Sequence, residues 1–100
     1  ANTVINENKP SDARELLARL RSSTEPIDVL EIGSGTGALT ALLVKWIERV
    51  HEPLGAHPTT RPVRSFVVAE PCDAMRRATS KALGRAGPPE FVEIVGQRAP

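Results

Sequence analysis

Hydrophobic and polar positions recur with a period that predicts three helices. Over residues 12–22 the apolar side chains fall at helical spacing, with Ser11 expected as the N-cap, and they are Ala13, Leu16, Leu17 and Leu20. A second helix is predicted from Gly37 to Val50, where one apolar stripe contains Leu39, Leu42, Leu43, Trp46, Ile47 and Val50. A third is predicted over 72–86, with inward positions at Met75, Ala78, Thr79, Ala82 and Leu83.

Short apolar runs between these helices predict three strands, at 27–32, 65–69 and 91–95. The resulting order is helix, strand, helix, strand, helix, strand, which favours parallel strands joined by helical crossovers. We therefore expect an α/β fold, a three-layer Rossmann-like parallel sheet of which this chain holds the first half. Residues 1–10 are polar and are expected to form a flexible N-terminal segment, and the proline-rich stretch 51–64 to form a long loop.

Composition narrows the class of protein but does not select a function. The chain has 100 residues and a formal net charge of +1, which suits one small domain without a general attraction to nucleic acid or anionic membrane. Cys72 is its single cysteine, so no internal disulfide can form. No apolar run reaches the length of a membrane span, and the first residues lack the pattern of a signal peptide. We expect a cytoplasmic enzyme.

The most informative stretch is the glycine-rich segment that follows the first predicted strand, Gly33-Ser34-Gly35-Thr36-Gly37. A strand must turn sharply into a helix here, and glycines allow both the turn and a close approach of a ligand to the backbone. The segment favours a nucleotide-type binding loop over a plain turn. Gly33, Gly35 and Ala38 also satisfy the dinucleotide pattern, which keeps a nicotinamide or flavin ligand open.

The same segment, preceded by Glu31, resembles motif I of class I methyltransferases, an acidic residue followed by G-x-G-x-G. The resemblance implies that the chain binds S-adenosyl-L-methionine and releases S-adenosyl-L-homocysteine. In that family the acid helps to orient the methionine end of the donor, and the glycines line its methionine and ribose. The implied cofactor-binding residues of this loop are Glu31, Gly33, Ser34, Gly35 and Gly37.

A second acid, Glu70, ends the next predicted strand and resembles the second signature of the same family. The resemblance implies that its carboxylate accepts hydrogen bonds from both ribose hydroxyls of the donor. It also implies that Pro71 and Met75 flank the adenine, although an inward methionine at helical spacing is equally well a core residue. Glu70 lies 37 positions after Gly33, more than the usual interval of about 20, and the loop 51–64 accounts for the excess.

After the third predicted strand, Gln97 stands where many methyltransferases carry an aspartate that binds the adenine amino group. An amide oxygen can accept the same hydrogen bond without a charge. Residues 11–100 would then form a partial donor-binding domain whose C-terminal half is absent. We assign no catalytic residue and expect the isolated chain to be inactive.

The methyl acceptor stays unidentified and could be a small molecule, a protein, a lipid or RNA. Two other functions remain open, namely the nucleotide-binding half of an NAD(P)-dependent oxidoreductase and a non-catalytic methyltransferase-like assembly module.

Weaker signals give secondary expectations. His51 and His57 lack further ligands at metal-binding spacing, so no metal site is expected. Cys72 is expected to be buried or inert. A basic stripe at helical spacing is either a solvated helix face or an RNA contact, and it comprises Arg77, Lys81 and Arg85.

Overall fold

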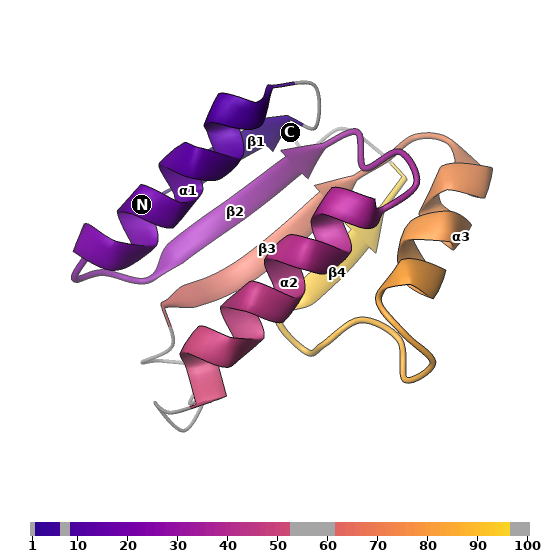
Figure 1. Ribbon diagram of the computed structural model, residues 1–100. Helices are drawn as coiled ribbons and strands as arrows, with labels where there is room; N and C mark the ends of the chain where they lie inside the picture. The colour runs from indigo at the N-terminus through magenta and orange to yellow at the C-terminus, as the bar shows by residue number, and fades with distance from the viewer. Residues whose placement is uncertain (1, 7–8, 53–61, 97–100) are drawn as a thin grey trace.

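The computed structural model describes residues 2–6, 9–52 and 62–96. These residues form strands and helices in alternation (Figure 1): β1 (Asn2–Asn6), α1 (Pro10–Ser22), β2 (Ile27–Ile32), α2 (Ala38–His51), β3 (Val63–Ala69), α3 (Asp73–Ala82) and β4 (Val92–Val95). The three strands and three helices predicted from the sequence are present, with ends shifted by a few residues.

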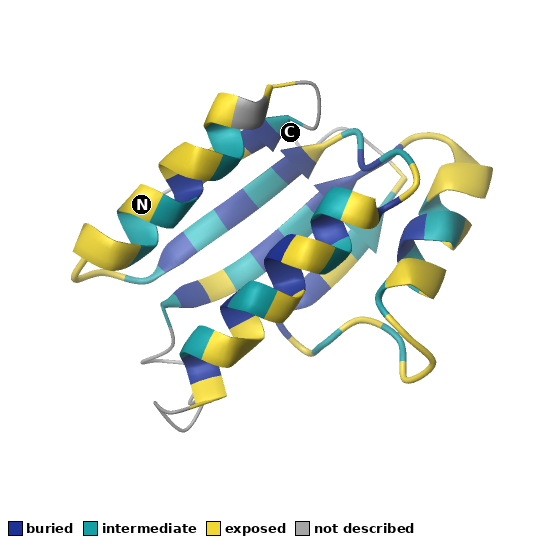
Figure 2. Ribbon diagram, in the orientation of Figure 1, coloured by how far each residue is buried: buried dark blue, intermediate teal, exposed yellow. Residues whose placement is uncertain are grey.

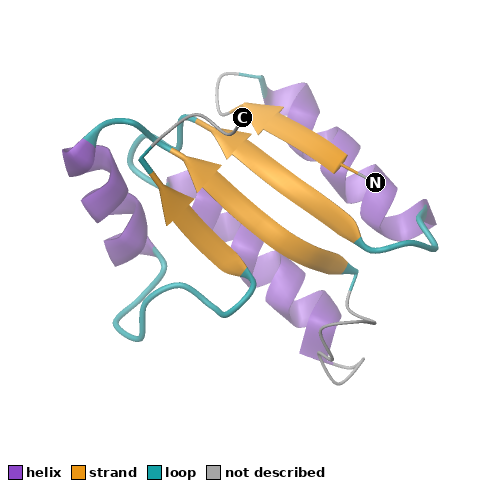
Figure 3. Cartoon of the chain, turned by 180° about the vertical axis from the view of Figure 1, so that it is seen from behind, coloured by secondary structure: helices purple, strands orange, loops and turns teal. Residues whose placement is uncertain are grey.

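The strands build one sheet, in the order β1-β2-β3-β4, with all neighbouring strands parallel. Because each crossover moves in the same direction across the sheet, successive crossovers of one hand place their helices on one face. All three described helices lie on that side of the sheet in Figure 1, with α3 beside the edge strand β4, and Figure 3 shows the opposite side with no helix over it in the described part of the chain. An α/β architecture compatible with a Rossmann-like fold is thereby confirmed, with two of the three predicted layers formed by the described residues.

Strand β1 corrects the prediction that residues 1–10 are loose. Residues 2–6 pair in parallel with β2, so that Val4 lies opposite Leu30. Thr3 and Ile5 are buried, whereas Val4 on the other face is exposed. The backbone N–H of Asn6 donates a hydrogen bond to the Asp12 carboxylate at 3.1 Å. With only two apolar residues among polar ones, this segment has too weak a hydrophobic pattern to predict a strand. The strand forms because it pairs with β2.

Helix α1 begins two residues earlier than the sequence predicts. Lys9 is the N-cap and Pro10 occupies the first helical position, where its missing N–H leaves no donor unsatisfied. The prediction of Ser11 as the N-cap is therefore wrong. The Asp12 carboxylate lies in the first turn, where the helix dipole favours a negative charge.

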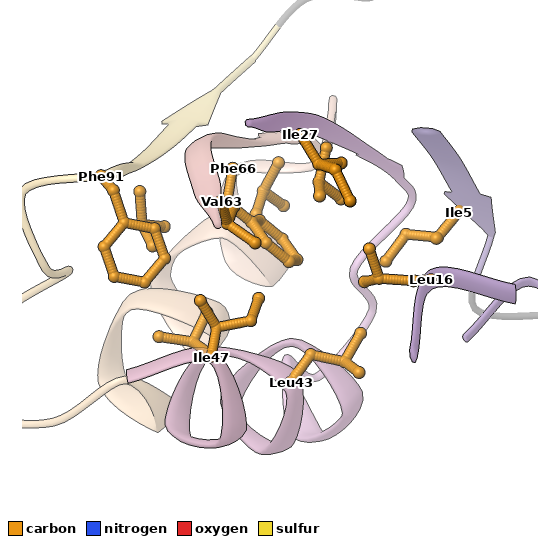
Figure 4. Packing of buried hydrophobic residues seen from close by; sticks show 12 residues of the cluster. Ile5, Leu16, Ile27, Leu43, Ile47, Val63, Phe66 and Phe91 are labelled. Atoms are coloured by element: carbon orange, nitrogen blue, oxygen red, sulfur yellow. The ribbon is translucent and has the colours of Figure 1, made fainter. Parts of the chain in front are cut away.

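The hydrophobic core lies between the sheet and the helices (Figure 4). Phe66 and Val63 of β3 and Ile27 of β2 point toward Leu43 and Ile47 of α2. Along β2 buried and partly buried residues alternate, as Figure 2 shows, because successive side chains point to opposite faces.

The predicted apolar stripe of α2 is broader than its buried face. Leu42 is 66% exposed, contrary to the prediction, and the buried residues of α2 are Thr40, Leu43, Val44, Ile47 and His51. His51 closes this face at the end of the helix, where its Nε2 accepts a hydrogen bond from the Val63 N–H at 3.2 Å. Its ring also meets Phe91 edge to face, with the ring centroids 5.0 Å apart. Thus His51 has a packing role in this structure.

Asp28 of β2 forms an ion pair with Arg64 of β3. Its carboxylate accepts hydrogen bonds from both Nε and Nη2 of Arg64 and from the Ser65 hydroxyl at 2.8 Å. The hydrogen bond from Arg64, supported by Ser65, holds the pKa of Asp28 below its ordinary value.

Replacing Asp28 by asparagine is therefore expected to lower stability slightly at neutral pH, because exposed pairs contribute little. A depressed folded pKa gives a contribution that is present above the unfolded value of about 3.9 and is lost as the pH falls through the folded value. Urea unfolding of wild type and Asp28→Asn should therefore show midpoints that converge below about pH 4. A difference that stays constant into acid would contradict this role for the charge.

Candidate functional site

The sequence-predicted site lies at the carboxyl edge of the sheet, where β2 and β3 end and α2 and α3 begin (Figure 1). Residue Ile32 pairs with Ala69, so the first residue beyond β2, Gly33, lies beside the first residue beyond β3, Glu70. The Gly33 N–H donates to the Ala69 carbonyl at 3.0 Å. The structure thus brings together the glycine loop and the second acid, which are far apart in the sequence. Ligands of open α/β sheets bind at this edge.

The glycine loop turns with positive φ at each of its glycines, 74° at Gly33, 55° at Gly35 and 84° at Gly37. Other residues adopt such angles only with strain, which explains the composition of the loop. The glycines differ in their surroundings. A Cβ at Gly33 would meet nothing within 4 Å, whereas a Cβ at Gly37 would lie 2.5 Å from the Thr79 Cα. Gly33 therefore leaves bare backbone for a ligand, and Gly37 allows α2 to pack closely on α3.

Glu70 lies against the glycine loop rather than in solvent. Its Oε1 accepts a hydrogen bond from the Gly35 N–H at 3.2 Å, and its Oε2 accepts one from the Cys72 N–H at 3.0 Å. The Glu70 N–H itself donates to the Val95 carbonyl of β4 at 2.9 Å. The side chain is buried, with the whole residue 7% exposed. One carboxylate thus links the glycine loop to the start of α3.

Glu31 lies on the helix-facing side of β2 and is fully buried. Its Oε1 accepts a short hydrogen bond from the hydroxyl of Thr40 in the first turn of α2. A carboxylate is favourable near the amino end of a helix, because the helix dipole is positive there. In this structure Glu31 therefore links the end of β2 to the first turn of α2. It has no exposed surface through which a ligand could touch it directly.

Ser34 also turns inward. Its hydroxyl is buried and shares a 2.6 Å hydrogen bond with the hydroxyl of Thr79 on α3. The implied cofactor contact of Ser34 is accordingly limited to its backbone. Thr79 was predicted only as an inward helix position, and its pairing with Ser34 could not be anticipated because the partners are 45 residues apart.

The remaining predicted residues near α3 are placed less favourably. Pro71 is exposed, and Met75 is 38% exposed, so the prediction that Met75 faces inward is wrong. Its exposure leaves it available to a ligand but does not place it in a site. Cys72 was expected to be buried or inert; it is exposed, so the first alternative is wrong. Gln97 lies outside the described residues.

Arg76 is a residue at this edge that the sequence did not single out. Its Nη1 donates to the carbonyls of Glu70 at 2.8 Å and Pro71 at 3.0 Å, and its Nη2 pairs with Asp73. A Cβ at Gly96, after β4, would lie 2.8 Å from Nη1. Arg76 thus fixes the segment that carries Glu70 against the end of β4. The available signal was the Asp73–Arg76 spacing, which places both on one helix face.

No family model, curated protein or solved structure matches the chain. Within the described residues, no group of acidic, histidine or cysteine side chains could hold a metal ion. None of the helices in that part of the chain is long and apolar enough to cross a bilayer.

Proposed function

We propose that this chain forms a binding site for S-adenosyl-L-methionine in a protein that transfers the sulfonium methyl group to an acceptor. The observation that carries the proposal is the position of the Glu70 carboxylate, held at the carboxyl edge of the sheet by the N–H groups of Gly35 and Cys72. Beside it, the backbone of Gly33 has open space where a side chain would otherwise lie. A fixed carboxylate next to bare backbone suits a cationic nucleoside that carries ribose hydroxyls.

The charge of this edge favours the methyl donor over a dinucleotide. In a dinucleotide site the pyrophosphate approaches the backbone N–H groups at the amino end of the helix that follows the glycine loop. Here the carboxylate of Glu70 occupies the N–H of Gly35 and places a negative charge in that position. A pyrophosphate would be repelled there, whereas a donor with an ammonium and a sulfonium would be attracted.

The residues present fit the donor in two different ways. Each oxygen of Glu70 has lone-pair capacity beyond its single backbone hydrogen bond, so the carboxylate can also accept from ribose hydroxyls. Glu31 is a positioning residue, because it is fully buried and acts on the loop through Thr40 at the start of α2.

When bound, the donor supplies the methyl group and leaves as S-adenosyl-L-homocysteine, and alignment of the acceptor with the methyl group supplies much of the rate. None of the described residues is assigned to the acceptor.

Replacing Glu70 by glutamine tests the proposal. Loss of the charge, and of one acceptor oxygen, should weaken the binding of S-adenosyl-L-homocysteine by about 10- to 100-fold, since a hydrogen bond to a charged group contributes about 1.5–3 kcal/mol. Isothermal titration calorimetry measures the change, with thermal unfolding to show that the variant folds. Glu48→Gln removes the same charge from the exposed side of α2 and should leave binding unchanged.

Two results would overturn the proposal. One is the absence of heat when S-adenosyl-L-homocysteine is titrated into the wild-type chain. The other is binding of NADH in its place, with an affinity that rises when Glu70 loses its charge, because that would indicate a phosphate at this position.

A further inference from the structure

A second concave surface lies on the side of α3 that faces away from Thr79, the α3 residue that contacts the glycine loop. It is a hollow of about 400 Å³ formed by the outer side of α3 and the turn that follows the helix, and its lining residues are Arg77, Ser80, Lys81, Gly84, Arg85 and Gly87. It is shallow and open to solvent, so a ligand there would be held by the charges of the lining rather than by enclosure. The lining of this basic hollow includes neither Thr79 nor any residue of the candidate donor site, so the two are separate.

The side chains around the basic hollow are strongly biased in charge. Three of its six lining residues are cationic and none is acidic, although the whole chain has a net charge of only +1. Arg77 and Lys81 are one helical turn apart, and Arg85 follows in the turn, so the three charges converge on one concavity. All three are exposed and have no ion-pair partner among the described residues, unlike Arg64 and Arg76.

Exposed cations with no ion-pair partner in the described part of the chain also occur on α2, at Lys45 and Arg49, and these are ordinary solvated residues. The basic hollow differs from them because its cations line one depression together with Ser80. The turn is shaped by Gly84 and Gly87, with φ of 109° and 81°, and a Cβ at either glycine would meet nothing within 4 Å. The backbone at these two glycines is therefore open to a ligand in the hollow.

The helix dipole works against an anion here, but it is the smaller effect. The carboxyl end of a helix carries about half a negative charge, whereas the three side chains carry three full positive charges. The dipole is further reduced because the N–H groups of Leu83 and Gly84 donate to the carbonyls of Thr79 and Lys81 at 3.1 Å. The charges around the basic hollow therefore sum to a net positive value.

From this geometry we infer that the basic hollow binds the phosphate groups of a small phosphorylated molecule. Guanidinium groups bind phosphate oxygens with paired hydrogen bonds, an ammonium group adds a point charge, and a hydroxyl donates a further hydrogen bond. None of the lining residues is aromatic, so a base could stack only on the guanidinium planes of Arg77 and Arg85. The cationic lining therefore favours phosphate groups as the ligand.

Titration of inorganic pyrophosphate into the chain tests this site. Binding should be observed at low salt, and it should weaken as salt is added because the contacts are electrostatic. Lys81→Gln should weaken it by about tenfold, since one hydrogen bond to a charged group is lost. The double variant Lys81→Gln/Arg85→Gln should abolish it. The matched control is Lys45→Gln/Arg49→Gln, which removes the same charge from α2 and should bind as wild type does.

Three results would overturn the inference: no binding by wild type, equal loss in the control and the pocket variants, or tighter binding of an oligouridylate that depends on Lys81 and Arg85. The third would assign the phosphates to a nucleic-acid backbone. The result is independent of the proposed donor site, because Lys81→Gln should leave S-adenosyl-L-homocysteine binding unchanged and Glu70→Gln should not weaken pyrophosphate binding.

Discussion

Replacing Gly37 by alanine should lower the free energy of unfolding by about 2–5 kcal/mol, a large fraction of the stability of a small domain. Two costs combine. The φ of 84° is strained for an alanine, at about 1–2 kcal/mol, and the added methyl group overpacks the contact with α3, at about 1–3 kcal/mol. The contact is severe because the new Cβ would lie 2.5 Å from a backbone atom, the Thr79 Cα, which cannot rotate away. Urea unfolding followed by circular dichroism measures the loss.

Gly33→Ala is the matched control for this prediction. Its φ of 74° imposes a similar backbone strain, but its Cβ would meet nothing within 4 Å. It should therefore cost only about 1–2 kcal/mol. Equal losses in the two variants would show that α2 and α3 do not approach closely at Gly37. If the proposed donor site is correct, Gly33→Ala should also weaken S-adenosyl-L-homocysteine binding, because the added methyl group fills the space beside Glu70.

The sequence predicted best the elements whose apolar pattern is strong and local. Strand β2 has the predicted bounds, and α2 begins directly after the glycine loop as expected, because a strand, a glycine turn and a long apolar stripe follow one another there. Strand β1 could not be predicted in the same way, since its short polar sequence forms a strand only through pairing with β2. Local periodicity carries no information about such a partner.

In the candidate site, too, the features set by local sequence could be predicted and those that depend on a distant partner could not. The position of Glu70 beside the glycine loop follows from two parallel strands that end at one edge, which the sequence predicts. The inward direction of Ser34 and Glu31 does not follow, because it depends on Thr79 and Thr40 as partners. Family resemblance assigned the three glycines one role, whereas packing in the structure separates Gly37 from Gly33. Side-chain partners across elements therefore had to come from the structure.

Phe66→Ala should be the most destabilising change in the sheet, at about 3–5 kcal/mol. Phe66 has no exposed surface, and its ring lies between β3 and the side chains of Leu43 and Ile47 on α2 (Figure 4). The backbone of β3 is held in place at Phe66, since β3 pairs with β2 and β4 there and the Phe66 N–H donates to the Phe91 carbonyl at 2.8 Å. The backbone therefore cannot collapse freely into the space that the ring leaves, and a cavity would remain.

Val67→Ala is the informative comparison, because Val67 is the next residue of β3 and faces the side of the sheet that no described helix covers. A half-buried valine on such a face should cost about 1 kcal/mol when truncated. Urea unfolding monitored by circular dichroism and by the fluorescence of the single tryptophan, Trp46, measures both variants. If Val67→Ala proved as costly as Phe66→Ala, the second face of the sheet would have to be packed against protein in solution. A small cost for Val67 beside a large one for Phe66 would instead place the stabilising core of these residues between the sheet and α2.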